Sequence, residues 1–490
     1  MSSAEGALAA HRPAPVRGRD RSPAPANREG ALLFLVLQVF LVILAVSRYD
    51  PTSFVFRGEE TIDFFSWFWR RRWFGMFSFF DFLLAAMTVL AAATAIRRRH
   101  RVGRGVDLFV PFLAALVAVS VVTRSVTRGP LDTRQDFLFQ LRNYLYLGLS
   151  YFVVRQLRWD ERRFRSIMKL LLALSAIVVL LFLVESIVLP AGFRVSKYGR
   201  TATVRDVADF AFVLFAQLWL IALALERFPR RWGSRIVLLG LIAYTFYSTF
   251  TGIGKAILVV YPAYLVYFFF HYRLYRNVTF MGVLLLGLLA LAALVRYLVV
   301  VNPVIEPSSP LYIYTTFTSD DPSVSTRRSE LVNFRENLSR RGGWLLGIGL
   351  GVKWFEYYDQ PPDLGAFPES ERGLPWHLGV HVPLVRLAYD FGPFGLALLL
   401  AFFGQRFLRS VRSLRSASLQ PSTRAFVQAG WLALAYEIFI NNLGVPKGIL
   451  LVGVLFGCMR GLLDTAPGAR TRAPVPRNPI SMRSPSPRPA

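Results

Sequence analysis

Residues Pro383–Arg415 read "PLVRLAYDFGPFGLALLLAFFGQRFLRSVRSLR". The first two thirds of this stretch are mostly apolar, whereas the last ten residues carry four arginines. A run of about 20 mostly apolar residues is long enough for a helix to cross the hydrocarbon core of a bilayer. Arginines that flank such a run gather on the cytoplasmic side of the membrane. The stretch therefore predicts a membrane helix that ends at the cytoplasmic surface.

The same pattern recurs along the chain, of which 54% is hydrophobic. Soluble helical proteins do not repeat runs of about 18 apolar residues many times, and a membrane β-barrel requires an alternation that is absent here. We predict an all-α polytopic integral membrane protein with about 12 transmembrane helices. The predicted spans are residues 30–47, 74–96, 106–123, 137–156, 167–189, 206–226, 235–250, 255–271, 277–300, 383–405, 425–441 and 447–463.

These spans divide the chain into five regions. We expect a disordered cytoplasmic N-terminus at 1–29, helices 1–9 within 30–300, a large external loop at 301–382, helices 10–12 within 383–463 and a disordered cytoplasmic tail at 464–490.

The formal net charge of +27 raises the question of a nucleic-acid partner. Its distribution argues against one, because the arginines lie in short loops between apolar spans, which is the signal of membrane orientation. These loops fall on one side together with both termini, so that side is predicted to be the cytoplasm. Contact of these arginines with anionic membrane lipids remains a further role for the charge. The loops read "RRRHRVGR", "RQLRWDERRFR", "ERFPRRWGSR", "HYRLYR" and "RFLRSVRSLR".

The largest connection on the opposite side is residues 301–382. Within it, Thr326–Gly351 reads "TRRSELVNFRENLSRRGGWLLGIGLG" and predicts an amphipathic helix that ends at Gly342-Gly343. Its apolar residues recur on one face at Leu331, Phe334 and Leu338. Aromatic side chains of the loop either stack on sugar rings or anchor it at the membrane interface: Trp344, Trp354, Tyr357, Tyr358 and Trp376.

Ionisable residues inside or at the edge of the predicted spans lie, with the exception of Lys169, in the outer half of their helix. Such residues are costly in a membrane and mark functional sites. Their positions predict a polar cavity open to the outer face, at the depth of the lipid headgroups. Scattered structural ion pairs are the alternative, above all for Asp81 and Glu437. The full set is Asp81, Arg142, Lys169, Glu185, Asp209, Lys255, Arg386, Asp390 and Glu437.

Two of the five histidines, His377 and His381, fall on the outer side. A histidine at the mouth of a polar cavity suits a general base or a proton relay, although one that only forms an interfacial hydrogen bond is the alternative. The single cysteine, Cys458, lies in an apolar run. It is predicted to pack as a small hydrophobe, which leaves no disulfide and no cysteine-based metal site.

Four motifs follow one another along the chain: "GRTATVRDVADFAFVLFA" at 199–216, "TFTGIGKAILVV" at 249–260, the loop stretch Thr326–Gly351 and "HVPLVRLAYDFGPFG" at 381–395. In this order they resemble motifs of the O-antigen ligase and O-antigen polymerase superfamily of bacterial membrane glycan transferases. The likeness covers roughly residues 70–460. This chain departs from the family at Lys255 and Val382, where the family has Arg and Asn, and Asp209 stands near the family's usual Asn.

The resemblance implies a GT-C-like fold in the bacterial inner membrane. It implies transfer of a glycan from a polyprenyl-pyrophosphate carrier to an acceptor hydroxyl at the outer face, with inversion and without a metal ion or other cofactor. His381 would take the proton of the acceptor hydroxyl. Cations would stabilise the charge that develops on the leaving pyrophosphate, a role implied for Arg328, Lys255, Arg200 and Arg142. Reserve candidates for the base are His377, Glu330, Glu369 and Glu371.

Two residues of the last motif are expected to serve structure instead. Arg386 and Asp390 are spaced i,i+4 and are predicted to pair. Ligase and polymerase share these motifs, so the sequence does not separate them. A transporter or flippase of lipid-linked glycan is the alternative function, although we find no pseudo-symmetric halves of the kind that transporters show. A membrane scaffold is a third class, and it would not require one-sided charges.

Overall fold

The computed structural model of the chain describes residues 28–48, 77–99, 108–129, 132–188, 211–227, 232–233, 264, 266–278, 281–282, 285, 289, 322–357, 376–377, 383–441 and 446–465. Its regular structure is helical, with one two-residue strand pair. The helices are α1 Arg28–Arg48, α4 Phe79–Arg99, α5 Phe109–Thr127, α6 Arg134–Arg155, α7 Glu161–Val188, α9 Ala211–Arg227, α14 Pro322–Arg340, α15 Pro383–Ser416, α16 Pro421–Tyr436 and α17 Pro446–Thr465, with a short 3₁₀-helix η2 Leu274–Arg276 and a π-helical segment η4 Glu437–Asn441.

Four of the described helices are long and apolar enough to cross a membrane, which makes the chain a multi-pass membrane protein. They contain the segments Phe79–Ile96, Phe109–Thr127, Pro383–Leu414 and Gly448–Thr465. Each overlaps a predicted span. Helices α1, α6, α7, α9 and α16 also coincide with predicted spans. The predicted spans 235–250, 255–271 and 277–300 lie mostly outside the described residues. The number of about 12 transmembrane helices therefore stays a prediction.

The basic stretch at 406–415 was predicted as a loop, and this prediction is wrong. Helix α15 continues through it to Ser416. Arginine is a good helix former, and one face of the stretch is buried, with Ser410 and Leu414 fully covered. The Arg406 guanidinium lies over the Phe402 ring, 4.9 Å from its centroid. The segment therefore packs as a helical extension of the span.

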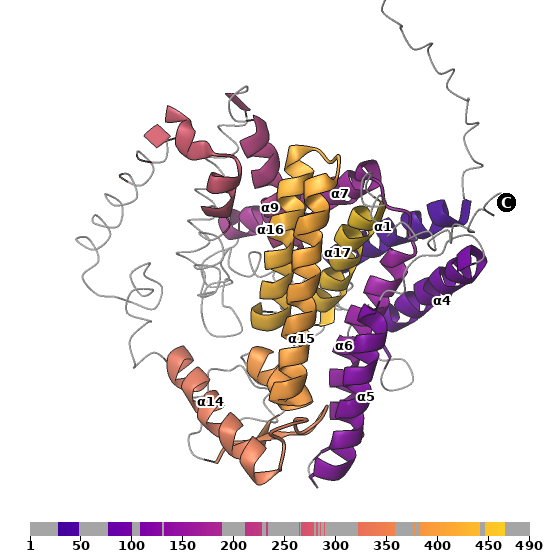
Figure 1. Cartoon of the computed structure of the whole chain (residues 1–490), viewed down its shortest axis with the longest axis vertical. Coiled ribbons are helices and arrows are strands. Elements are labelled where there is room, and N and C mark those ends of the chain that lie inside the picture. The colour runs from indigo at the N-terminus through magenta and orange to yellow at the C-terminus, as the bar shows by residue number, and fades with distance from the viewer. Residues whose placement is uncertain are drawn as a thin grey trace, which may run out of the picture.

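Different elements lie at the two ends of the helices. We call the end where α15 begins and α14 lies the loop end, and the end where α17 finishes at Thr465 the tail end (Figure 1). The loop end is the one that the arginine pattern predicts to face the exterior. At the tail end, α6 and α17 are joined by Arg155 Nη2, which donates to Asp464 Oδ2 at 2.6 Å.

Helices α6 and α17 lie in close contact along their length because α17 presents a glycine every fourth residue. A Cβ at Gly453 would overlap Ser150 Oγ of α6, and one at Gly461 would overlap the ring of Trp159, which follows the end of α6. Between them, a Cβ at Gly457 would lie 2.9 Å from that of Val154. Such small-residue stripes let helix backbones approach in membranes, where apolar burial supplies little drive for association.

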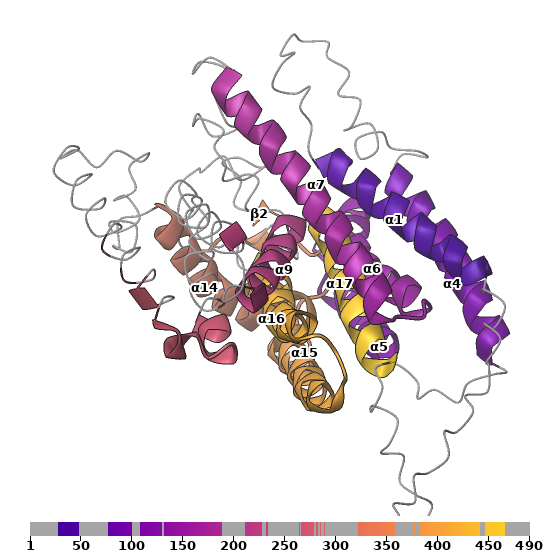
Figure 2. The same ribbon diagram turned by 90° about the horizontal axis from the view of Figure 1, so that it is seen from above.

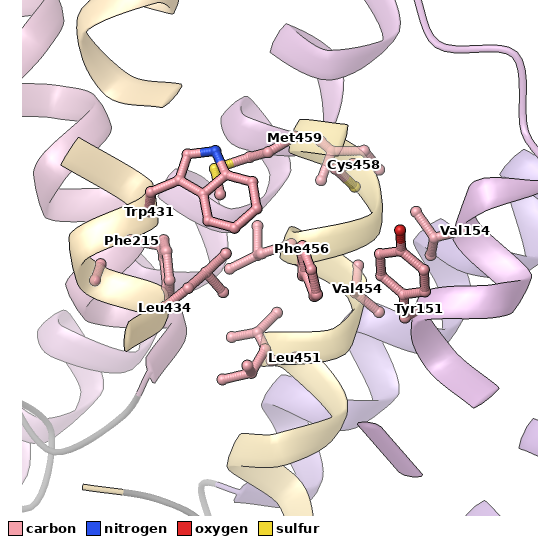
Figure 3. Close-up of a cluster of buried hydrophobic side chains, with 14 of the residues drawn as sticks. Tyr151, Val154, Phe215, Trp431, Leu434, Leu451, Val454, Phe456, Cys458 and Met459 are labelled. Atoms are coloured by element: carbon pink, nitrogen blue, oxygen red, sulfur yellow. The ribbon is translucent and has the colours of Figure 1, made fainter. Parts of the chain in front are cut away.

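The other faces of α17 pack against aromatic side chains (Figure 3). The Phe456 ring lies 4.6 Å from the Tyr151 ring of α6 and 5.2 Å from the Trp431 ring of α16. Cys458 is fully buried in this cluster, so its predicted packing as a small hydrophobe is confirmed. These contacts make α17 the link between α6 and α16.

A second group of helices surrounds this centre. Trp219 of α9 meets the rings of Phe164 of α7 and Phe426 of α16 edge to face, at 6.2 and 5.4 Å. Helix α1 lies alongside α4 and α7 (Figure 2). At the tail end, Glu161 Oε1 accepts from Thr423 Oγ1 at 2.6 Å and from the Gln420 backbone N–H at 3.1 Å, which ties α7 to α16.

We predict opposite stability effects for two glycine-to-alanine changes. In Gly453→Ala, the new Cβ lies 2.7 Å from the Leu147 carbonyl oxygen, and overpacking of this kind costs about 1–3 kcal/mol. Gly404→Ala, in α15, meets nothing within 4 Å and should gain about 0.5–1 kcal/mol from helix propensity. Thermal unfolding in detergent measures both. An equal or higher melting temperature for Gly453→Ala would contradict the close contact of α6 with α17.

Candidate functional site

Helix α14 ends as the glycine pair predicts. Gly342 has a φ of 68°, and the Gly343 N–H donates back to the Leu338 carbonyl at 2.9 Å, which closes the helix end. Leu338 is fully buried and Phe334 stacks on the Trp354 ring at 6.4 Å. Leu331, which shares their helical spacing, is 56% exposed. The amphipathic helix is therefore present, but its buried face is narrower than the spacing suggests.

A ladder of buried polar side chains runs along α14 at Ser329, Asn333 and Asn337. Asn337 donates to the Phe355 carbonyl at 2.6 Å and accepts from the Phe355 N–H at 3.2 Å. Asn333 Oδ1 accepts from the Tyr357 N–H at 2.8 Å. The side-chain amides of α14 thus bind an extended backbone as a neighbouring strand would.

That extended backbone is β1, Trp354–Phe355, which pairs antiparallel with β2, Trp376–His377. Trp354 lies opposite His377 in the register. Helix α14 and β2, which are distant in sequence, are consequently joined through β1. We call α14, β1 and β2 the loop frame.

The turn between α14 and β1, residues 343–351, is held against the helices α5, α6 and α15; we call it the glycine turn. Gly347, Gly349 and Gly351 have φ values of 81°, 101° and 72°, a region that side-chain-bearing residues rarely adopt. A Cβ at Gly347 would lie 2.6 Å from the Tyr389 carbonyl of α15, and one at Gly349 would lie 2.6 Å from the Arg124 backbone nitrogen of α5. At Gly351, a Cβ would overlap the Phe137 backbone of α6.

Side chains of α5 and α6 bind the polar backbone groups of the glycine turn. Arg124 donates to the Leu350 carbonyl at 2.7 Å and to the Thr133 carbonyl at 3.0 Å. Gln140 accepts from the Gly351 N–H at 2.6 Å, and Thr127 Oγ1 donates to the Ile348 carbonyl. Sequence reasoning missed Arg124 and Gln140. The basic residue closing the apolar run 106–123 was the available signal for Arg124.

Helix α15 supplies a further contact because it is kinked. Gly392 has φ 76° and ψ 163°, and Pro393 follows it. Proline has no N–H, so the Tyr389 carbonyl, four residues earlier, loses its helical donor. The Ile348 N–H of the glycine turn donates to this carbonyl at 2.7 Å. The next carbonyl, that of Asp390, accepts from Ser120 Oγ of α5 at 2.6 Å.

A buried ion pair lies just before the kink. Arg386 Nε is 3.1 Å from Asp390 Oδ1, so the predicted pairing is confirmed. Tyr144 of α6 donates its hydroxyl to Asp390 Oδ2 at 2.8 Å. Asp390 is 1% exposed and Arg386 is 9% exposed. A carboxylate at this depth requires such partners, so the pair fixes α15 against α6.

The predicted pyrophosphate ligand Arg142 lies elsewhere on α6. Its Nε is 3.2 Å from Asp81 Oδ1 of α4. Asp81 also accepts from Tyr146 at 2.7 Å and from Ser78 Oγ at 2.8 Å. Asp81 therefore forms a structural ion pair, which was the alternative to a place in the predicted polar cavity. A substrate role for Arg142 stays a prediction.

The other predicted site residues are distributed as follows. Glu330 lies in α14 and is 3% exposed. Arg328 and His377 lie on the backbone of α14 and β2, and their side chains are outside the described part of the chain. The residues wholly outside it are His381, Lys255, Arg200, Glu369 and Glu371. The loop frame thus carries Arg328 and Glu330 on α14 and His377 on β2.

The loop aromatics divide into buried and exposed side chains. Trp354 is fully buried between Phe334 and Tyr389, so both alternatives, stacking on a sugar ring and anchoring at the membrane interface, are wrong for it. Arg340 lies over the Tyr357 ring, 4.3 Å from its centroid. Trp344 is 51% exposed. The side chain of Trp376 and all of Tyr358 fall outside the described residues.

No protein family matches the chain, and no curated protein matches it. In the described ranges, no group of three His, Cys, Asp or Glu side chains is arranged to hold a metal ion. The resemblance to the ligase and polymerase superfamily therefore rests on the four motifs and stays a prediction.

We expect Gly349→Ala to loosen the glycine turn. Its φ of 101° strains any L-residue by about 1–3 kcal/mol, and the added Cβ would also lie 2.7 Å from the Ser120 carbonyl. Gly342→Ala is the control, since its φ is also positive but nothing lies within 4 Å. Thermal unfolding and protease cleavage within residues 322–382 should change more for Gly349→Ala. Equal effects of the two changes would refute the packing argument.

We expect Arg386→Met to destabilise the protein by about 3–5 kcal/mol, because it leaves the Asp390 carboxylate buried without its cation. The double variant Arg386→Met/Asp390→Asn removes both charges and keeps an acceptor for Tyr144, so it should recover most of that loss. Unfolding in detergent, compared across the two singles and the double variant, measures the coupling. Additive losses would show that the pair contributes no coupling.

Proposed function

We propose that the chain transfers a glycan from a polyprenyl-pyrophosphate carrier to an acceptor hydroxyl at the outer face of the cytoplasmic membrane, as an O-antigen ligase or polysaccharide polymerase does. The observation that supports it most is the loop frame. It joins the backbones that carry Arg328 and His377, and the glycine turn packs it on α5, α6 and α15. His381 follows four residues after His377 and precedes the first residue of α15 by two.

This arrangement suits transfer chemistry at a membrane surface. A lipid-linked pyrophosphate keeps its carrier in the bilayer, so the groups that act on it must be held near the ends of the membrane helices. Arg124 donates to the Leu350 carbonyl and Gln140 accepts from the Gly351 N–H, and these contacts tie the glycine turn next to the loop frame to α5 and α6. Rigid positioning of reactants and catalytic groups supplies much of an enzyme's rate enhancement.

In the proposed reaction, the acceptor hydroxyl attacks the anomeric carbon while its proton passes to His381. The bond from that carbon to the pyrophosphate oxygen breaks, and the lipid pyrophosphate leaves with the bonding electron pair. Arg328, Lys255 and Arg200 stabilise the charge that develops on it. Arg142 is a further cation of the set, and His377, Glu330 and Glu369 are reserves for the base.

Complementation of a gene deletion tests this function. We expect wild type to restore the surface glycan, and His381→Ala or Arg328→Ala to lose at least about 10²-fold of transfer, the usual contribution of a general base or of one oxyanion-stabilising group. Carrier-linked intermediates identify the step: long glycans that accumulate indicate a ligase and single repeat units a polymerase. Intermediates retained on the inner face would instead indicate a flippase.

Two matched controls accompany this test. His271→Ala removes a histidine next to η2, and Arg340→Ala removes an arginine at the opposite end of α14 from Arg328. Both should support normal transfer. Full rescue by His381→Ala would remove that residue as the base, and unchanged transfer by purified Arg328→Ala would remove the pyrophosphate assignment.

A further inference from the structure

Three consecutive large apolar side chains project from the glycine turn. Trp344 is 51% exposed, Leu345 64% and Leu346 43%. The residues that follow, 347–352, are all buried. A contiguous exposed apolar group of this kind, next to a rigidly packed segment, marks an interaction surface. We call these three residues the apolar tip.

The packing of the turn fixes the level of the apolar tip along the helices. A Cβ at Gly392 would overlap the Leu345 carbonyl, so the tip lies beside the kink of α15. We take Arg409, the first exposed arginine of the basic stretch 406–415, as the polar boundary at the tail end of that helix. The hydrocarbon core is about 30 Å thick, which is about 20 helical residues. Counting back from Arg409 puts the other boundary near Tyr389, at the level of the tip.

Helix α5 gives the same level independently. Its span, Phe109–Thr127, has 19 residues, about 28 Å of helix, so its last turn lies at the membrane boundary. Thr127 and Arg124 of that turn donate to the Ile348 and Leu350 carbonyls. Both helices therefore put residues 344–350 at the edge of the hydrocarbon core.

The backbone around the apolar tip has the hydrogen-bond partners that a position at the edge of the hydrocarbon core requires. Irregular backbone at membrane depth is tolerated where protein groups satisfy it. The Gly347 N–H donates to the Gly343 carbonyl at 2.9 Å, and the Ile348 N–H donates to Tyr389 at 2.7 Å. The backbone of the turn is thus bound to protein groups. The side chains of the tip stay exposed, and the Trp344 indole N–H donates to Ser339 Oγ at 3.2 Å.

Exposed apolar side chains also lie on the two helices, α5 and α15, that hold the glycine turn. Phe394, two residues beyond Gly392 on α15, is 52% exposed, and Val122 and Val126 on α5 are 66% and 82% exposed. Arg340, four residues before the tip, has 55% of its side chain exposed. An aromatic and aliphatic group next to a basic residue is the composition of membrane-interface anchors.

We propose that Trp344, Leu345 and Leu346 insert into the lipid leaflet at the loop end and anchor α14 to the membrane surface. The occupant of this surface is lipid: acyl chains around Leu345 and Leu346, and the interfacial region around Trp344. The anchor and the glycine turn then hold α14 from two sides. This inference does not depend on the proposed glycan chemistry.

The single cysteine makes a direct test practical. Cys458 is fully buried, so a cysteine at Leu345 is the one that labels. We would attach a nitroxide to Leu345→Cys, in both the wild-type and Cys458→Ala backgrounds, and reconstitute the protein in phosphatidylglycerol and phosphatidylethanolamine vesicles. Molecular oxygen, which concentrates in lipid, and a water-soluble nickel chelate then serve as relaxing agents.

Two reference positions calibrate the measurement. Val122→Cys reports lipid contact on α5, and Arg335→Cys reports an exposed position on α14. We expect Leu345→Cys to resemble Val122→Cys, with relaxation dominated by oxygen. Relaxation dominated by the nickel chelate, as at Arg335→Cys, would mean that the tip lies in water and would overturn the proposal. Protection from both agents would mean that protein, from this chain or a second copy, covers the tip, which would also overturn it.

Discussion

The loss of one helical hydrogen bond in α15 organises the loop end of this protein. Pro393 offers no N–H to the Tyr389 carbonyl, and a buried carbonyl without a donor costs about 1–3 kcal/mol. The Ile348 N–H meets that requirement from the glycine turn. Its approach is close enough that Gly347 and Gly392 leave no room for side chains between them. The position of the turn then determines where α14, β1 and β2 lie.

The two halves of α6 are held by different physical means. Toward the loop end, buried polar contacts dominate, with Gln140 bound to the glycine turn and Tyr144 bound to Asp390. Toward the tail end, the glycine stripe of α17 allows close backbone contact. Polar contacts fix one register and orientation because a displaced buried carboxylate is costly. The glycine stripe relies on dispersion contacts, each weak but many in number.

The spacing of residues along the sequence predicts much of this architecture. The features that it does not predict depend on contacts between residues that are far apart in the sequence. Apolar runs give α4, α5, α15 and α17, and i,i+4 spacing gives the Arg386–Asp390 pair. Spacing carries no information about Arg124, whose acceptor on Leu350 is 226 positions away, or about Tyr144, which is 246 positions from Asp390. The helical extension through 406–415 was missed because the arginines suggested a loop, whereas buried Ser410 and Leu414 stabilise a helix there.

The glycines of the loop motif, which contribute to the resemblance, have a structural explanation in this chain. In this chain, Gly347, Gly349 and Gly351 are explained by backbone contacts with α15, α5 and α6, and no ligand is needed to account for them. The Asp390 carboxylate is likewise committed to Arg386 and Tyr144. These motif residues are therefore explained by the loop frame and the way it packs on the helices. In the proposed function, the chemistry of transfer rests on side chains that the frame carries or that directly precede α15: Arg328, His377 and His381. A scaffold of this kind can keep its glycines while the reacting groups diverge, which makes substitutions at those three positions the decisive evidence for function.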